Sequence, residues 1–350
     1  MIRALHVVRC GPGVTVQDMG RAGRLDDGLS EGGAADRLAL SEGAALLGQP
    51  VEVAALELAG TDAMLRAIAD IRIALTGAPS QARIDGEPIT FNTSYLLKNG
   101  QTLILGYAVR GNYSYLHVGG GFDTPPLLGS RSTHLAARIG GPVRPDSLLP
   151  VAEDPGDRIG LTLDVRERYG GGVLRVVPSF QTEQFDAGML ARLSETRFTR
   201  HSHGNRMGVK LAFEGAPLNA RQQLDILSES IVPGDVQIVG EGEPFVLLGE
   251  CQTTGGYPRI GTVIPPDITL IAQARPGDPI QFRFVDRAEA MIAYRDYRGL
   301  LSALPRAVRP YVRDPHDIPD LLAYQLVGGA VTGKEEESHG GVEDDGFGRP

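Results

Sequence analysis

The sequence contains no tryptophan, only two cysteines and only three lysines among its 350 residues. Two cysteines, Cys10 and Cys251, cannot supply a disulfide framework. Basic side chains are nearly all arginine, so few groups are available for lysine chemistry. The chain therefore depends on neither disulfide bonds nor a lysine-rich surface.

An excess of positive charge and a long apolar run are also missing. The formal net charge is −9 and the pI is near 5.3, which argues against a nucleic-acid partner and against a basic membrane-binding face. No apolar run approaches the ~20 residues of a membrane-spanning helix. The first residues show no basic, apolar and cleavage pattern of a signal peptide. We therefore expect a cytoplasmic protein.

Glycine (46 residues) and proline (24 residues) are abundant, whereas aromatic residues make up 6%. This composition favours many short strands and turns over a helical bundle. Helices are predicted at 34–47, where Gly48 marks the end, and at 186–193 and 287–297. Asn99-Gly100, between two apolar runs, predicts the turn of a hairpin. Strands are predicted at 2–8, 14–17, 71–75, 113–118, 173–177, 210–213, 236–239, 245–248, 268–272 and 280–284.

The length suggests two domains as a prior. A stretch rich in Pro, Gly and Asp at 145–172 predicts the boundary between them. We expect an N-terminal domain at 1–160, a C-terminal domain at 173–300 and an extension at 301–350. Acidic residues without an apolar period predict disorder from about residue 333.

The segment 249–260 is the most informative part of the chain. It follows the apolar run 245–248 and contains amide and hydroxyl donors, two glycines and one aromatic ring. These candidate site residues are Gln252, Thr253, Thr254, Gly255, Gly256 and Tyr257. The alternative is a turn that closes a β-barrel, because glycine pairs are common in turns.

Three further groups of residues offer charge. Arg131 lies between Ser130 and Ser132, and Arg206 lies in an Asn-Arg-Met-Gly run; a guanidinium binds carboxylate or phosphate with two hydrogen bonds. Each arginine is equally compatible with a structural ion pair. Asp36 beside Arg37, and Gln17-Asp18 before Arg21, could supply a base, although a structural ion pair is the favoured interpretation.

Other short motifs do not indicate a site. The run 328–334 matches G-x-x-x-x-G-K, but Glu335 stands where a P-loop needs Ser or Thr. His201 and His203 lack a visible third ligand, so we expect no metal site. Cys251 has no histidine base nearby in sequence and is expected to be a packed thiol. No G-x-S-x-G elbow is present.

Several of these segments together resemble one family, which includes the C subunit of 5-oxoprolinase, KipA and allophanate hydrolase subunit 2 and is also called the biotin-dependent carboxyltransferase family. The resemblance extends over roughly residues 5 to 290. The segments that carry it are 15–21, 32–37, 129–133, 205–208, 228–234, 249–260 and 272–278.

The resemblance implies a mainly β fold of two cyclophilin-like β-barrel domains with a few short helices. It implies a share in the ATP-dependent opening of 5-oxoproline to glutamate, with ATP and Mg²⁺ bound by this chain or by a partner. It also implies a heterotetramer with a subunit-B-like protein, which resembles allophanate hydrolase subunit 1, and a subunit-A-like protein as a further partner.

The resemblance implies that Gln252, Thr253, Thr254, Tyr257 and Asp36 act in catalysis. The Gln252 amide and the Thr254 hydroxyl would stabilise charge on the substrate carbonyl. Ser130, Arg131, Arg206, Gly255 and Gly256 would bind substrate or anion. We expect Arg131, Arg206 and residues 252–257 to line one pocket.

Two alternatives remain open. The first is carboxyl transfer from carboxybiotin to urea or a similar amide, with the same donors at the substrate carbonyl. No Met-Lys-Met tripeptide is present, so biotin would arrive on a partner. The second alternative is a KipA-like regulatory protein that binds its target without catalysis.

Overall fold

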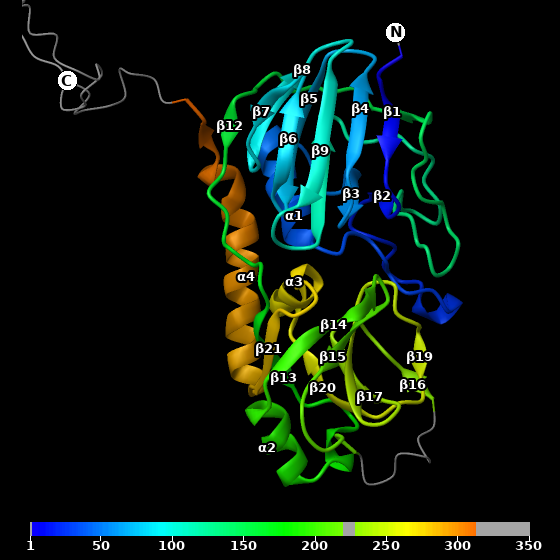
Figure 1. The fold of residues 1–350 in the computed structure, drawn as a ribbon, viewed down its shortest axis with the longest axis vertical. Coiled ribbons are helices and arrows are strands. Elements are labelled where there is room, and N and C mark those ends of the chain that lie inside the picture. Colours follow the sequence, from blue (N-terminus) through cyan, green and yellow to red (C-terminus); the bar gives the residue numbers. More distant parts are fainter. Residues whose placement is uncertain (1, 220–227, 313–350) are drawn as a thin grey trace, which may run out of the picture. The chain divides into compact units, whose positions relative to one another are not determined.

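The N-terminal half of the computed structural model folds into two β-sheets that share one core (Figure 1). The structure describes residues 2–219 and 228–312. The six-stranded sheet has the order β11 (Leu148–Pro150), β1 (Ala4–Cys10), β4 (Ala63–Ala67), β9 (Thr102–Ala108), β6 (Ser80–Ile84), β7 (Glu87–Ile89). The seven-stranded sheet has the order β2 (Val14–Gln17), β3 (Ala55–Ala59), β10 (Tyr113–Val118), β5 (Ile71–Gly77), β8 (Thr93–Leu97), β12 (Leu161–Thr162), β22 (Arg309–Pro310).

Alternating burial along the strands explains how these two sheets pack. In β4 every second side chain is buried, and in β9 Leu103 and Leu105 are buried, so each strand turns one apolar face toward the core. Leu65 and Leu103 of one sheet meet Leu56 and Leu116 of the other in that core. Helix α1 (Arg37–Leu47) packs against β5 and β10 on the far side of the seven-stranded sheet.

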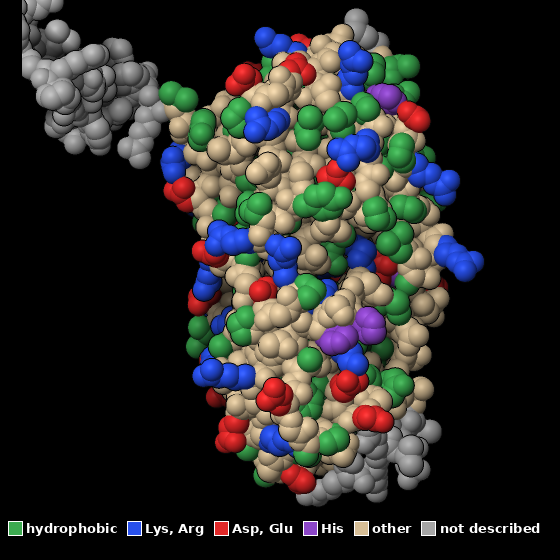
Figure 2. Space-filling view, viewed as in Figure 1, with side chains coloured by type: hydrophobic (Ala, Val, Ile, Leu, Met, Phe, Trp, Pro, Cys, Tyr) green, Lys and Arg blue, Asp and Glu red, His purple; other side chains and the backbone are tan. Residues whose placement is uncertain are grey.

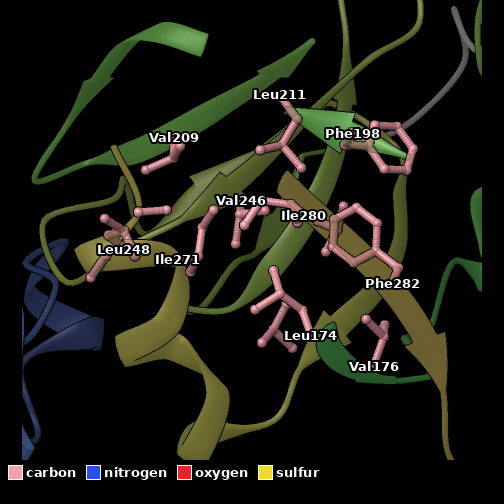
Figure 3. Packing of buried hydrophobic residues seen from close by; sticks show 14 of the residues in the cluster. Leu174, Val176, Phe198, Val209, Leu211, Val246, Leu248, Ile271, Ile280 and Phe282 are labelled. Atoms are coloured by element: carbon pink, nitrogen blue, oxygen red, sulfur yellow. The ribbon is translucent and has the colours of Figure 1, made fainter. Parts of the chain in front are cut away.

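The C-terminal half contains a closed seven-stranded barrel. Its strands follow in the order β13 (Gly172–Val177), β20 (Arg259–Val263), β17 (Asp235–Val239), β18 (Glu243–Leu247), β15 (Gly208–Ala212), β14 (Phe198–Asn205), β21 (Pro279–Phe284). Figure 3 shows Phe198, Phe282 and Leu174 among the apolar side chains that fill it. Helices α2 (Ala187–Glu195) and α3 (Pro265–Gln273) pack against barrel strands, and two short strands, β16 (Glu229–Ser230) and β19 (Thr254–Gly255), pair separately.

The long helix α4 (Arg287–Ala307) passes both α3 and α1 (Figure 1). Asp286 caps its first turn by accepting a hydrogen bond from the Glu289 N–H at 2.8 Å. Only Ala293 and Leu304 of its 21 residues are buried. The helix therefore packs along a narrow stripe and leaves most of its surface exposed.

The prediction of a mainly β fold with a few helices is confirmed, and most predicted strands appear within a few residues of their positions. One predicted strand is wrong: residues 268–272 belong to helix α3. Pro265 and Pro266 occupy the first helical turn, where their missing N–H groups cost nothing, and Asp267 complements the helix dipole.

The Asn99-Gly100 turn is also corrected. It was predicted to join a hairpin, but β8 and β9, which flank it, belong to different sheets. Among the strands for which no range was predicted are β3, β4, β14 and β20. Helix α4 continues ten residues past the predicted end at Tyr297, to Ala307.

Contacts group Met1–Tyr311 into one compact unit, and the division into cyclophilin-like domains 1–160 and 173–300 stays a prediction. The disorder predicted from about residue 333 and the G-x-x-x-x-G-K run lie outside the described residues. Within the described ranges, no helix is long and apolar enough to cross a membrane. Acidic and basic side chains are interspersed over the face shown in Figure 2.

Candidate functional site

A cavity of about 990 Å³ lies among α1, α3, α4 and two loops, 31–35 and 248–249. A volume near 1,000 Å³ is at the upper end of the range for small-molecule sites. Its lining residues from the helices are Arg37, Ser41, Ala44, Ala45, Pro265, Ile268, Thr269, Tyr294, Tyr297, Arg298, Leu301, Ser302 and Pro305. Those from the rest of the chain are Met19, Glu31, Gly32, Gly33, Ala34, Ala35, Gly48, Gln49, Val51, Arg206, Pro233, Leu248 and Gly249.

Arg206 provides a buried cation at the edge of this cavity. It lies in the turn between β14 and β15, which carries it out of the barrel toward the N-terminal half. Its guanidinium pairs with Glu57 of β3 and with Glu250, and it donates a further hydrogen bond to the Gly33 carbonyl. Burial lowers the pKa of Arg206, but the two carboxylates outweigh that effect and the pKa lies above its ordinary value. Arg206 is therefore permanently charged.

The carboxylates of Glu57 and Glu250 accept further hydrogen bonds. Glu57 accepts hydrogen bonds from the Ala35 N–H (2.9 Å) and the Tyr115 hydroxyl (2.6 Å). Glu250 accepts one from the Ala136 N–H at 3.1 Å. Two carboxylates around one guanidinium leave this buried cluster with a formal charge of −1. The cluster joins β3, the β14–β15 turn and the loop after β18.

Free hydrogen-bond donors also lie at this end of the cavity. The N–H groups of Gly33 and Gly249 make no hydrogen bond within the described part of the chain, and both residues line the cavity. The two loops touch, because the Gly32 N–H donates to the Gly249 carbonyl at 2.9 Å. Arg206 has five N–H protons and uses three of them in the contacts above. Donors from two loops and one guanidinium thus meet at one end of a largely apolar cavity.

Asp36, a predicted catalytic residue, has three structural partners. It caps α1 by accepting from the Ala39 N–H at 3.0 Å, and it accepts from Arg168 Nε at 2.7 Å and Gln273 Nε2 at 2.8 Å. Arg168 also makes two hydrogen bonds to Glu42, at 2.8 and 2.6 Å. Asp36 is fully buried and does not line the cavity. It ties α1, α3 and residue 168 together.

Ser130 and Arg131 lie in a turn that Asp18 organises. Asp18 accepts hydrogen bonds from the Ser130 hydroxyl and from the Arg131 N–H, both at 2.6 Å, and from the Ser132 hydroxyl. The Arg131 guanidinium pairs with Asp123 at 2.8 Å on the surface. Neither Ser130 nor Arg131 lines the large cavity.

The segment Gln252–Tyr257 forms an exposed edge beside β16. Thr254 and Gly255 are β19, which pairs with Ser230 and Glu229, and the Thr253 carbonyl accepts from the Ile231 N–H at 3.0 Å. Gln252, Thr254, Gly256 and Tyr257 are exposed. Of the residues predicted to share a pocket, only Arg206 lines the large cavity. Their catalytic roles stay predictions.

Sequence reasoning did not find Glu57, Glu250 or His134. His134 is buried, its Nε2 lies 2.9 Å from the Ser30 hydroxyl, and its Nδ1 lies 3.8 Å from a Glu250 oxygen. Ser30 and His134 are 104 positions apart and Ala136 and Glu250 are 114 apart, so spacing along the chain gives no signal for these contacts. The one clue is that His134 follows the 129–133 motif directly.

Cys251 and the histidine pair remain outside the site. Burial raises the pKa of the Cys251 thiol to about 12, which leaves it a packed, unreactive side chain. His201 and His203 lie on β14 with their ring centroids 5.0 Å apart. Among the described residues, no three His, Cys, Asp or Glu side chains gather as metal ligands.

Comparison with known proteins identifies a single family. Residues 27–284 match the profile described as "Carboxyltransferase domain, subdomain A and B". The chain is 34% identical to the C subunit of 5-oxoprolinase from Escherichia coli strain K12 over 304 residues, covering 86% of this chain and 97% of that protein. It is 35% identical to the corresponding 5-oxoprolinase C subunit of Haemophilus influenzae over 301 residues, covering 84% and 95%. Urea amidolyase of Saccharomyces cerevisiae is 24% identical over 87% of this chain, which spans 18% of that protein.

Solved structures agree with this match. The crystal structure of TTHA0988 superposes with a TM-score of 0.74 at 31% identity and covers 81% of this chain, which spans 56% of that chain. The Kluyveromyces lactis urea amidolyase superposes with a TM-score of 0.77 over 89% of this chain and 21% of that chain. Its identity of 20% shows a shared fold alone.

Proposed function

Because the chain belongs to the carboxyltransferase-domain family of subdomains A and B, we propose that it is a subunit of an ATP-dependent 5-oxoprolinase. In this proposal it acts in the cytoplasm with a subunit-B-like partner, and its large cavity holds the 5-oxoproline ring. Two relatives that it covers almost completely are C subunits of 5-oxoprolinase by name. That name supports both the reaction and the need for partners.

The proposal rests mainly on one observation: several free hydrogen-bond donors lie at one end of the cavity. A lactam carbonyl gains negative charge on oxygen when a nucleophile attacks its carbon. The N–H groups of Gly33 and Gly249, with the unused protons of Arg206, are able to stabilise that charge. Side chains such as Val51, Ile268 and Leu301 provide the apolar wall that a five-membered ring requires.

The reaction also requires a cationic side chain that can bind the phosphate group. Arg298 of α4 lines the cavity and makes no ion pair within the described residues, whereas Arg37 on the facing helix pairs with Glu31 at 2.9 Å. A phosphate transferred from ATP would find Arg298 available on that side. We propose that ATP and its Mg²⁺ are bound mainly by the partner.

Carboxyl transfer to urea or a similar amide is the second candidate, favoured by the family description and by the urea amidolyase relatives. The same donors would polarise an amide carbonyl. In that case biotin, carried on a partner, would enter the cavity.

Reconstitution tests the proposal. This chain is co-expressed with a subunit-B-like protein, the mass of the purified product is measured by light scattering, and glutamate and phosphate are followed with 5-oxoproline and ATP. We expect a stable complex with two copies of each chain, and glutamate formed only when ATP is present. Carboxylation of urea by carboxybiotin, without glutamate formation, would favour the second candidate. A monomer that ignores its partner would contradict both.

A further inference from the structure

The turn from Leu127 to Ser130 exposes two leucine side chains. The exposed fractions of Leu127 and Leu128 are 47% and 52%. The turn is tight, because the Leu127 N–H donates to the Ser130 carbonyl at 2.8 Å and the Ser130 N–H donates to the Leu127 carbonyl at 3.2 Å. Its two central residues, Leu128 and Gly129, have φ angles of 53° and 85°, as in a type I′ turn. Such a turn favours asparagine or glycine at both central positions.

Leu128 therefore lowers the stability of the free chain in two ways. A left-handed φ is strained for leucine, and its exposed side chain keeps apolar surface in contact with water. Among the described residues, the other non-glycine residues with a positive φ are all polar or charged: Asp85, Asn92, Arg138 and Asp146. Asparagine at position 128 would remove both costs. Local strain of this kind is characteristic of functional contacts.

Two buried side chains hold the turn in this shape. Asp18 accepts hydrogen bonds from the Ser130 hydroxyl and the Arg131 N–H, both at 2.6 Å. Arg21 donates from Nε to the Leu127 carbonyl at 3.0 Å and from Nη2 to the Ser130 carbonyl at 3.4 Å. The two leucines are thus exposed on a braced turn.

A small cavity of about 210 Å³ lies beside the turn. Arg21 connects the two features, because it lines the cavity and binds the turn. At about 30 Å³ per water molecule, the cavity has the volume of about seven waters and can take one large apolar side chain. Leu25 and Val232, which line it, are exposed large apolar residues. Its other apolar or small lining residues are Ala22, Gly23, Leu29, Ile231 and Pro233.

Charged groups beside the turn and the cavity are largely paired. Arg24, which lines the cavity, pairs with Asp27 at 3.2 Å, and Arg131 pairs with Asp123 at 2.8 Å. The net charge of the chain, −9, disfavours an anionic membrane as the partner. Apolar side chains surrounded by paired charges are typical of a protein–protein interface, which has an apolar centre and a polar rim.

We propose that this docking surface, formed by the turn 127–130, Leu25, Val232 and the small cavity, binds the subunit-B-like partner. One apolar side chain of the partner would fill the small cavity, as anchor residues do at the centre of an interface. The four exposed side chains of the surface amount to roughly 300 Å² of apolar area, a size at which exposed patches mark interaction sites. A standard interface buries about 800 Å² on each partner, so these side chains would form its centre and the surrounding loops its rim.

The choice of this partner rests on the proposed function, whereas the docking surface itself does not. Two relatives that the chain covers almost completely are C subunits by name. The chain spans only 56% of TTHA0988, so in that solved relative the matched region is joined to further polypeptide. Both observations favour a protein partner.

The docking surface adjoins the large cavity, because Glu31 and Pro233 line both cavities. In Figure 1 the blue loop that contains Leu25 stands at the edge of the molecule where the two halves meet. A partner docked there would border the large cavity. ATP held by that partner would then lie beside the proposed lactam site.

The test is the Kd of the full chain for the purified subunit-B-like protein, measured by biolayer interferometry without substrate. Leu128→Asn should melt at or above the wild-type temperature, because asparagine tolerates a left-handed φ, and its Kd should rise at least about tenfold. Ala22→Trp places a large ring at the small cavity and should also raise the Kd at least about tenfold. The matched control is Leu148→Asn, which removes an exposed leucine of β11 and should change the Kd less than about twofold.

Weaker binding by Leu128→Asn and Ala22→Trp, with Leu148→Asn unchanged, supports the docking surface. Wild-type Kd values for folded Leu128→Asn and Ala22→Trp, or an equal loss in Leu148→Asn, would overturn it; should Ala22→Trp fail to fold, Leu128→Asn decides alone. Self-association, or co-sedimentation with phosphatidylserine vesicles, that Leu128→Asn abolishes in place of partner binding would overturn the assignment to this partner. A complex that forms through this surface but makes no glutamate from 5-oxoproline and ATP supports the docking surface and removes only the proposed function.

Discussion

His117 shows how burial of one residue sets a pH dependence. It is buried on β10, and its Nε2 lies 2.8 Å from the Thr76 hydroxyl, whose own proton is donated to the Ala39 carbonyl. The ring therefore donates to Thr76 and is neutral. Burial lowers the pKa of His117 from 6.5 to about 3.

We predict a loss of stability in acid that depends on His117. Below pH 6.5 the unfolded chain binds a proton that the folded ring does not, so stability falls as the pH drops and levels off only near the folded pKa of about 3. The slope is at most about 1.4 kcal/mol per pH unit. The His117→Gln amide can still donate to Thr76 but does not titrate. In urea unfolding between about pH 5 and 8, the dependence of its unfolding free energy on pH below 6.5 should therefore be smaller than that of wild type by up to that slope. Parallel curves for the two proteins would contradict the prediction.

Arg206 gives the second prediction at the scale of one residue. Arg206→Met leaves Glu57 and Glu250 buried without their cation, and breaking a buried ion pair in this way costs about 3–5 kcal/mol. The melting temperature should fall by several degrees or more. Arg298→Met, in the same cavity but without an ion pair within the described chain, is the control and should melt nearly as wild type. Equal melting of both variants would show that the buried cluster contributes little.

The sequence indicated Arg206 but not its partners. A guanidinium in a small-residue loop predicts an anion site or an ion pair, and both alternatives were open. The structure pairs it with Glu57, which lies 149 positions away, and with Glu250. Contacts of that separation depend on the packing of the two halves, which local pattern does not encode. The segment 252–257 was predicted to line a pocket, but four of its six residues are exposed. Hydrogen-bond donors and glycines in a sequence do not by themselves predict that a segment faces a cavity.

At the scale of elements, the helix signals located α1, α2 and α4, and all but one of the predicted strand ranges coincide with observed strands. Strands β2 and β10 match their predicted ranges, because their apolar runs are short and bounded by turns. Helix α3 was predicted as a strand, because a short apolar run fits either structure when its flanking prolines are overlooked. The signal was present in Pro265-Pro266-Asp267.

Helix α4 gives the prediction at this scale. Leu304 is its largest buried side chain and packs in a cluster with Leu38, Leu46 and Leu161. Leu304→Ala should destabilise the protein by about 2–4 kcal/mol in urea unfolding, since it leaves a cavity under a helix with few other anchors. Met291→Ala, on the exposed side of α4, is the matched control and should stay within about 0.5 kcal/mol of wild type. Similar values for the two variants would show that α4 is not docked through Leu304.

At the scale of the whole molecule, one cavity depends on both halves of the chain. Helix α1 and loop 31–35 come from the N-terminal half, whereas α3, Arg206 and Gly249 come from the barrel half, and α4 provides the third wall. Such a site exists only when the two halves are packed together. The family resemblance predicted the fold class and the family, but the location of this cavity required the structure.

The central claim is that this cavity is where 5-oxoproline reacts, and neighbouring positions on α4 test it directly. Ser302 lines the cavity and Ala303 does not. In the complex with the subunit-B-like partner, Ser302→Trp fills part of the cavity, and we expect kcat/KM for ATP-dependent 5-oxoproline hydrolysis to fall at least about tenfold, which corresponds to ~1.4 kcal/mol. Ala303→Trp adds the same side chain one residue further along and should retain wild-type activity, with both variants folded and assembled. Equal activity of the two variants, at saturating ATP, would contradict the account.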